Sequence, residues 1–159
     1  MTSDAHEYRS ELAWSGSTGG GYDAYPRTHW VRAEPADQEL TLSGDQAFGG
    51  DPLLLNPEQL VVAAASSCQL LSFLAVAARA RIDVVDYRDA ATAVMPAEPE
   101  PMSIARIELS PIITIAPPAG EDGPSDERLA HLCEVAHREC FVANSLRTEV
   151  VVTPKFLRA

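Results

Sequence analysis

The sequence predicts an α+β protein in which an antiparallel β-sheet accompanies a long, central, buried helix and a second, shorter helix. Three observations support this fold class. Residues 60–80 form the longest apolar stretch of the 159-residue chain. Segments of alternating polarity, which are typical of strands, stand on both sides of that stretch. A second segment with helical periodicity follows near residue 125, so strands and helices are mixed along the chain.

Three strands are expected before the long helix. The first lies within residues 7–16, and the glycines at 19–21 form a turn after it, because glycine accepts backbone angles that other residues avoid. Residues 29–33 alternate in polarity and form the second strand, which Pro35 ends. Residues 40–42 form a short third strand. Together these segments predict an antiparallel meander.

The long helix begins with a strong start signal at Asn56. Asparagine is a favourable N-cap, Pro57 suits the first helical position, and Gln59 stands where a capping box needs it. The helix is expected to run to about residue 80, a length of about 35 Å. It is apolar nearly all round, which is typical of a helix that is buried on most sides. Polar side chains interrupt it, so a core helix is predicted rather than a membrane span.

Further strands are expected after the long helix. Residues 82–95 form one strand, and residues 104–115 alternate well enough to form another. Pro111 indicates an edge or a bend there, because proline cannot donate to a strand ladder. Residues 149–153 form the last strand. The pairing of these strands is expected to be antiparallel.

The second helix lies between the last two strands and starts at Ser125. Its hydroxyl can accept a backbone N–H at the N-cap, and two acidic residues follow it at the positive end of the helix. The spacing along this segment places five residues on one amphipathic face. They are Leu129, Leu132, Cys133, Ala136 and Cys140.

Composition and charge limit the expected partners. The formal net charge is −11 at pH 7, and a surface of this sign repels nucleic-acid phosphates and anionic lipids, so neither nucleic acid nor a membrane is an expected partner. The first residues lack the pattern of a secretory signal. Three cysteines are a sparse and odd set rather than a disulfide framework. We therefore expect a cytoplasmic protein of one domain, residues 1–159, with residues 1–6 as a loose tail.

Cys68 in the long helix and Cys140 at the end of the second helix are the candidate reactive groups. A lone cysteine in an apolar helix is more often a packing residue, whereas a reactive thiol needs access and a nearby cation. No basic residue lies within a turn of Cys68, so the cation must come from elsewhere, and Arg27 is one candidate. Its simpler interpretation is a solvated surface arginine. Glu58 equally suits the first turn of a helix without any catalytic role.

A metal site is not expected. Cys133, His137 and Cys140 have helical spacing that metal ligands could use, but a structural zinc site usually has four ligands and a convincing fourth is missing. The chain also lacks a Cys-x-x-Cys pair, which excludes a thioredoxin motif. No metal and no other cofactor are therefore predicted.

Two segments resemble motifs of one known family. Residues 56–68, NPEQLVVAAASSC, resemble the helix motif of the OsmC/Ohr proteins, the organic hydroperoxide reductases. Residues 136–146, AHRECFVANSL, resemble the second cysteine motif of that family, although the family often has Cys-Pro where this chain has Cys140-Phe141. The order of strands and helices agrees as well, so the resemblance covers nearly the whole chain.

This resemblance implies a peroxiredoxin-like thiol peroxidase that reduces organic hydroperoxides to alcohols in oxidative-stress defence. Cys68 matches the peroxidatic cysteine and Cys140 the resolving one, so a sulfenic acid on Cys68 would condense with Cys140 to a disulfide. An outside dithiol, such as a lipoylated protein, would reduce that disulfide. Glu58 matches the acidic residue of the family motif. Arg27 is the best match for the arginine that polarises the thiolate, and Arg32 is the other candidate.

Helix geometry adds an expectation about assembly. Glu58 and Cys68 are ten residues apart, which is about 15 Å along one helix, so they cannot share a site within it. Two antiparallel copies that cross near Ala63 would bring Glu58 of one chain to Cys68 of the other. We therefore expect an intertwined homodimer with two composite sites, in which Cys133 packs or serves as a back-up resolving thiol.

Two alternatives stay open at this point. The same OsmC-like dimer could bind a small apolar or thiol ligand without catalytic turnover, or it could be a plain structural dimer with core cysteines. The reactivity of Cys68 discriminates between them, because a binding protein needs no thiol of lowered pKa.

Overall fold

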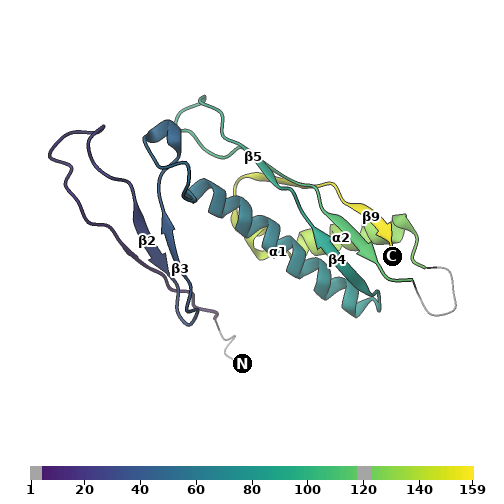
Figure 1. The fold of residues 1–159 in the computed structure, drawn as a ribbon. Helices are drawn as coiled ribbons and strands as arrows, with labels where there is room; N and C mark the ends of the chain where they lie inside the picture. The colour runs from purple at the N-terminus through teal and green to yellow at the C-terminus, as the bar shows by residue number, and fades with distance from the viewer. Residues whose placement is uncertain (1–4, 118–122) are drawn as a thin grey trace. The chain divides into compact units, whose positions relative to one another are not determined.

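The computed structural model describes residues 5–117 and 123–159 (Figure 1). The chain divides into two compact units, Met1–Leu60 and Val61–Ala159. The predicted tail at residues 1–6 lies largely outside the described residues. The prediction of one domain over the whole chain stays a prediction.

The first unit contains the predicted meander. Its three strands pair antiparallel in the order β1-β2-β3. The first strand is shorter than the predicted segment 7–16. A short 3-10 turn, η1, follows the meander and was not predicted. The bounds are β1 Glu11–Ala13, β2 His29–Arg32, β3 Glu39–Leu42 and η1 Gln46–Phe48.

The loop around η1 requires glycine at two positions. A Cβ on Gly50 would lie 1.7 Å from the Gly44 carbonyl oxygen, so the two backbones approach more closely than any side chain allows. Gly49 has a φ of +78°, in the left-handed region that favours glycine. Asp45 closes this loop, since its carboxylate accepts the Ala47 N–H at 2.7 Å and its carbonyl accepts the Gly50 N–H.

Helix α1, Pro57–Arg79, begins where the sequence predicts. The Gln59 N–H donates to Asn56 Oδ1 at 2.8 Å, and the Asn56 N–H donates to Gln59 Oε1 at 3.0 Å, so the capping box forms in both directions. By length and composition α1 could also cross a membrane, a property that it shares with the core helices of soluble proteins.

Burial of α1 is narrower than predicted. One stripe of the helix is buried, comprising Ala65, Gln69, Phe73, Val76 and Ala77. Apolar residues on the other sides of the helix are exposed to solvent, and Leu71 is 63% exposed. The expectation of a helix buried on most sides is therefore wrong within one chain.

The second unit contains a three-stranded sheet whose strands are each broken into two pieces. The pieces pair in the orders β4-β7-β9 and β5-β6-β8. The predicted strands 82–95 and 104–115 are thus β4 with β5 and β6 with β7, and the latter pair runs through the middle. The bounds are β4 Val84–Arg88, β5 Thr92–Val94, β6 Arg106–Leu109, β7 Ile112–Ile115, β8 Glu149–Val152 and β9 Lys155–Arg158.

The break in the sheet has a local cause. Pro111 lies in the middle strand and has no N–H to donate, while its carbonyl accepts the Lys155 N–H at 2.8 Å. The Ser110 N–H bonds to Asp89 Oδ1 at 2.8 Å, so a side chain takes the place of a ladder carbonyl. The expected bend at Pro111 is confirmed, and the alternative of an edge position is wrong.

Strand directions differ from the prediction on one side of the sheet. β4 and β5 pair antiparallel with the middle strand, as expected. β8 and β9 pair parallel with β6 and β7. The reason is the helical crossover between β7 and β8, because parallel neighbours need such a long connection. Strand β9 was not predicted.

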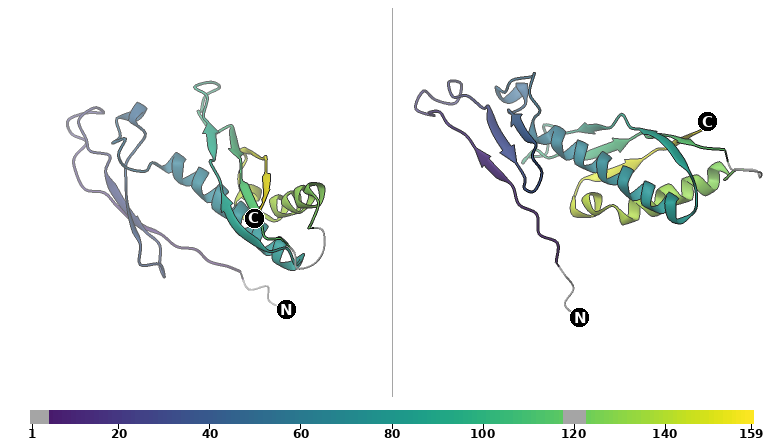
Figure 2. Two further views of the ribbon diagram at one scale, coloured as in Figure 1. Left: turned by 45° about the vertical axis from the view of Figure 1, so that its right-hand side comes forward. Right: turned by 60° about the horizontal axis from the view of Figure 1, so that its bottom comes forward.

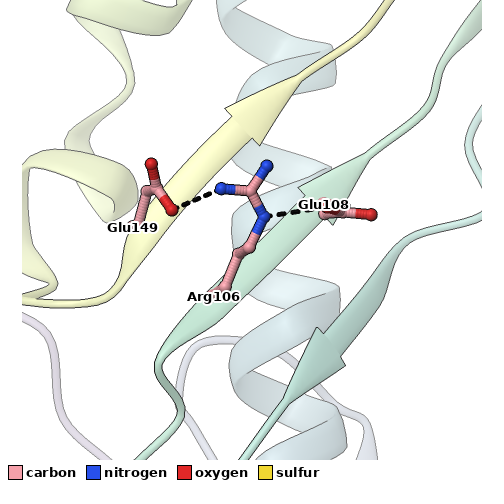
Figure 3. Close-up of polar contacts among 3 residues, drawn as sticks. All are labelled: Arg106, Glu108 and Glu149. Carbon is pink, nitrogen blue, oxygen red and sulfur yellow. Dashed lines mark hydrogen bonds and ion pairs between the residues drawn. The ribbon is translucent and has the colours of Figure 1, made fainter.

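Ion pairs lie along the parallel edge (Figure 3). Arg106 on β6 binds Glu108 Oε1 through Nε at 2.8 Å and reaches Glu149 on β8 through Nη1. Arg106 and Glu149 are also register partners. All three side chains are exposed, so these pairs stabilise the fold little.

The helices of the second unit lie on one face of its sheet (Figures 1 and 2). α2, Asp126–Glu139, starts at Ser125, whose Oγ accepts the Arg128 N–H at 3.2 Å. A short helix that was not predicted, α3, Phe141–Ser145, follows directly. Buried side chains from α1, β7 and α2 form the main core. They are Phe73, Val76, Ala77, Ile113, Ile115, Leu129, Cys133 and Ala136.

Candidate active site

Cys68 lies near the middle of α1, at the boundary between buried and exposed residues. Its sulfur accepts the backbone N–H of Val142 at 3.5 Å. The Ser72 hydroxyl, one turn further along α1, also acts to lower the pKa of Cys68. Val142 belongs to α3, so the contact joins the long helix to the segment after α2.

Cys140 occupies the junction between α2 and α3. It is the last cap of α2 and the N-cap of α3, with an extended backbone at φ −72° and ψ 107°. Its sulfur accepts the Ala143 N–H at 3.4 Å, and its side chain is 1% exposed. The Cys68 sulfur accepts the N–H of the next residue but one, Val142, each thiol shifts the pKa of the other, and both thiols are free. The structure therefore brings the two predicted cysteines together.

The two thiols have opposite pKa shifts. Burial by itself raises the pKa of Cys68. Hydrogen bonds from the Val142 N–H, the Cys140 thiol and further donors outweigh burial, so the pKa of Cys68 lies below its ordinary value. Burial raises the pKa of Cys140 to about 11, and the negative charge on Cys68 adds to this. Cys68 therefore loses its proton more readily than Cys140.

Cys133 is separate from this pair. It is 2% exposed and lies in the main core. The Gln69 side-chain amide donates to its carbonyl at 3.4 Å and lies 3.6 Å from its sulfur. Burial raises the pKa of Cys133 to about 11, with a small opposing effect from Gln69. These contacts suit the expected packing role.

Sequence reasoning missed the residues that fix α1 beside the sheet. Ser66 Oγ donates to Asp89 Oδ2 at 2.5 Å, and the other carboxylate oxygen of Asp89 accepts the Ser110 N–H. Ser66 is two residues before Cys68, so this link anchors the same stretch of helix. Asp89 stands between β4 and β5, and a single acidic residue at a strand break gives little signal in a sequence.

Arg27 lies in the first unit, inside a group of aromatic side chains. Its guanidinium donates to the carbonyl oxygens of Tyr25 at 2.8 Å and Tyr22 at 2.7 Å. The guanidinium carbon lies 4.2 Å from the ring centre of Tyr25 and 4.9 Å from that of Tyr22. A mostly apolar cavity of about 440 Å³ adjoins it, lined in part by Trp14 and His29.

The surroundings of the two candidate arginines differ. Arg32 is held by Glu11 across the β1–β2 pair, with both Nε and Nη2 on the same carboxylate oxygen. Arg27 forms no ion pair with any residue that the structure describes. Arg27 is therefore the better candidate for a cation that serves a thiolate.

Glu58 is in the first turn of α1 and belongs to the first unit. Its Oε2 atom is buried and accepts no hydrogen bond within residues 5–117 and 123–159. A buried carboxylate oxygen without a donor is costly and calls for an explanation. Because Arg27 and Glu58 belong to the first unit and the thiol pair to the second, their roles beside Cys68 stay predictions. No cluster of metal-ligating side chains is present among the described residues.

The second unit thus combines an α+β fold, with two helices on one face of a sheet, with two neighbouring free thiols, Cys68 and Cys140. Residues 49–155 match the profile of the family described as OsmC-like protein. This match covers more than half of the chain, so the chain belongs to the OsmC-like family. The fold predicted from the resemblance is confirmed.

Solved structures of similar fold support this membership. An OsmC-like protein of unknown function from Vibrio cholerae is 26% identical, with a TM-score of 0.83 over 94% of this chain and 99% of that one. An organic hydroperoxide resistance protein from Elizabethkingia anophelis is 20% identical, with a TM-score of 0.70 over 99% and 100%. One from Legionella pneumophila is also 20% identical, with a TM-score of 0.66 over 95% and 96%. No curated protein matches the chain.

Proposed function

We propose that this protein is a cysteine-based thiol peroxidase that reduces organic hydroperoxides to alcohols and acts in oxidative-stress defence. The observation that carries the proposal is the pairing of Cys68 and Cys140, whose sulfurs accept neighbouring N–H groups of α3 and whose pKa values shift in opposite directions. Family membership supports it, since some solved structures of this fold are named organic hydroperoxide resistance proteins.

In the first step the Cys68 thiolate attacks the terminal oxygen of the hydroperoxide. The S–O bond forms while the O–O bond breaks, and the leaving alkoxide takes one proton to become the alcohol. Cys68 is thereby oxidised to a sulfenic acid, and the peroxide is reduced. The lowered pKa of Cys68 favours this step because the thiolate is the nucleophile.

In the second step the Cys140 sulfur attacks the sulfenic sulfur of Cys68. A disulfide forms, and the departing hydroxyl combines with the Cys140 proton to leave as water. Loss of the negative charge on Cys68 removes one of the effects that raise the pKa of Cys140. An outside dithiol, such as a lipoylated protein, then reduces the disulfide and is itself oxidised to a cyclic disulfide.

Arg27 and Glu58 complete the proposed site. The Arg27 guanidinium would stabilise the Cys68 thiolate and the developing oxyanion, and the Glu58 carboxylate would hold the guanidinium. The absence of an acidic partner for Arg27 and of a donor for Glu58 Oε2, both within the described residues, supports this assignment. We further propose a homodimer in which Glu58 of one chain serves Cys68 of the other.

Reduced thiols at rest require a reducing compartment, so a cytoplasmic location is part of the proposal. Nucleic acid and membranes are not proposed as partners, given the net charge of −11.

The test is turnover of cumene hydroperoxide with a small dithiol as reductant. Cys68→Ser should abolish turnover because the nucleophile is lost. Cys140→Ser should allow one turnover and then stall with an oxidised Cys68. Mass spectrometry of peroxide-treated wild type should find a Cys68–Cys140 disulfide. Normal turnover by Cys68→Ser would refute the proposal.

A ligand-binding function without turnover is the second candidate. The apolar cavity beside Arg27, about 440 Å³ in volume, favours it because such a cavity can hold a small apolar molecule. Its discriminating result is a Cys68 thiol that does not react with cumene hydroperoxide, together with saturable quenching of Trp14 fluorescence by an apolar ligand.

A further inference from the structure

A buried amide joins the two helices that carry the thiols. Gln69 is the residue after Cys68 on α1, and it is 0% exposed. Its Nε2 atom donates to the Cys133 carbonyl of α2 at 3.4 Å and lies 3.6 Å from the Cys133 sulfur. Because a carbonyl oxygen can only accept, the NH₂ end of the amide faces Cys133. The side chain next to Cys68 is thus bound to the helix that ends at Cys140.

Beside this amide, the two helices meet through apolar side chains of the main core, such as Phe73 of α1 and Leu129 of α2. Apolar attraction has no preferred direction, so packings in which α1 is shifted along α2 are close in free energy. The ion pair between Arg79 and Glu139 also joins the helices, but its side chains are 63% and 52% exposed, so it fixes their register only weakly. A directed, buried hydrogen bond selects one register more strongly.

The amide of Gln69 is costly for stability. Its Oε1 atom is buried and accepts no hydrogen bond within the part of the chain that the structure describes, and such an acceptor loses its hydration without compensation. The Cys133 carbonyl lies inside α2, so it has a helical partner with or without Gln69. Packing alone would therefore favour an apolar residue at position 69. Buried polar groups of this kind are best known for fixing the register between helices.

We propose that Gln69 is a positioning residue, which holds α1 against α2 in the register that places Cys68 beside Cys140 and thereby favours their disulfide. The inference rests on the proposed function and deepens it at the resolving step. The contact at Cys133 lies seven residues before Cys140, about two helical turns. Directly after Cys140, the Val142 N–H donates to Cys68. Gln69 acts through the two helices and needs no contact with either sulfur of the pair.

Gln69→Met isolates the amide. Methionine has a similar length and no amide, and it adapts to irregular core spaces. Because the unpartnered acceptor is removed, Gln69→Met should unfold in urea with a free energy equal to or above that of wild type. Phe73→Leu is the control, since it is one turn further along the buried stripe of α1 and lacks a polar link to α2. It should lower stability through lost packing.

The measurement is the equilibrium constant of the Cys68–Cys140 disulfide in buffers of oxidised and reduced dithiothreitol, read by mass spectrometry after acid quench and alkylation. The two thiols give two electrons and two protons to the cyclic disulfide of the reagent, which becomes a dithiol. Gln69→Met should lower the constant by about fivefold, the scale of one buried hydrogen bond. Phe73→Leu should leave it unchanged despite its lower stability.

Three results would overturn the proposal. One is an equal constant in wild type and Gln69→Met, and another is an equal fall in Phe73→Leu. Gln69→Leu is the second variant in case Gln69→Met does not fold, and it should lower the constant in the same way. If neither variant folds, the amide is needed for the fold itself, which contradicts the expected gain in stability.

This assay uses no peroxide, so it separates the two proposals. A lowered constant in a protein that never reduces cumene hydroperoxide would keep the role of Gln69 and reject the peroxidase. Normal peroxide turnover with an unchanged constant in Gln69→Met would keep the peroxidase and reject the role of Gln69.

Discussion

Cys68, Cys140 and Cys133 have the same side chain, and their surroundings make them chemically different. Cys68 accepts several hydrogen bonds and has a lowered pKa, despite partial burial. Cys140 donates to that sulfur, and Cys133 is enclosed by the core, so both have pKa values of about 11. Spacing alone predicted none of these differences, because each depends on groups that are distant in sequence.

The raised pKa of Cys133 predicts a loss of stability at alkaline pH. Above the ordinary thiol pKa of 9.0, the unfolded chain gives up a proton that the folded protein keeps until about 11. The folded state then binds more protons, so the free energy of unfolding falls as pH rises through this range, by up to about 3 kcal/mol. Cys133→Ala should remove this contribution and flatten the profile.

Urea unfolding at about pH 8 and about pH 11, with reductant present, measures how the free energy of unfolding changes with pH in wild type and in Cys133→Ala. The difference between the two slopes belongs to Cys133 and to Tyr87, whose pKa the charge on Cys133 raises. Identical slopes would contradict the prediction.

At the scale of elements, the sequence predicted those whose signals are local. Asn56 with Gln59 and Ser125 mark helix starts, and both helices begin there. The break between β6 and β7 could be predicted only in part. Pro111 indicates a bend in the sequence, but the hydrogen bond from the Ser110 N–H to Asp89 joins two different strands and has no local sequence signal. The parallel direction of β8 and β9 depends on the whole crossover, which no short segment encodes.

The candidate site divides in the same way. Cys68 and Cys140 were found from two sequence motifs. The donors that distinguish them are mostly backbone N–H groups of α3, a helix of five residues that was not predicted. Every residue except proline has a backbone N–H, so the residue type does not show which N–H groups lie beside a sulfur. These donors could be located only from the structure.

The loop after η1 predicts a selective effect on Arg27. A Cβ on Gly49 would lie 2.9 Å from the guanidinium carbon of Arg27, and the φ of +78° strains any L-residue. Gly49→Ala should therefore lose about 1 kcal/mol of stability and also displace the guanidinium. If Arg27 serves the thiolate, peroxide turnover should fall well beyond what the stability loss explains.

Gly21 provides the matched control for this substitution. Its φ is +91°, and a Cβ there would meet nothing within 4 Å. Gly21→Ala should have a similar strain without touching Arg27, so turnover should stay near wild type. Equal activity of the two variants would show that the contact between Gly49 and Arg27 has no functional effect.

At the scale of the whole molecule, the exposed apolar side of α1 predicts assembly. Leu71 is 63% exposed on a helix that is apolar nearly all round, and a second copy of the chain would cover it. Leu71→Glu should disrupt the proposed dimer, because a charge in an apolar interface loses its hydration. Peroxide turnover should fall with dimerisation, since each site is proposed to need both chains.

Sedimentation and turnover at matched concentrations check this prediction. Val94→Glu is the control, because Val94 is 59% exposed and lies on β5 rather than on α1. It should leave both readouts unchanged. A monomeric wild-type protein with full activity would contradict the composite site.

The contact between Cys68 and Cys140 has a consequence for the lifetime of the protein. A disulfide here would close a loop of about 70 residues, which in the chain-entropy description stabilises a folded protein by about 4 kcal/mol. The oxidised molecule would open about a thousandfold less often than the reduced one. Proteases cleave opened molecules, so oxidised molecules that have not yet been reduced would be degraded most slowly. The fraction of the protein that resists digestion would therefore increase with its exposure to peroxide.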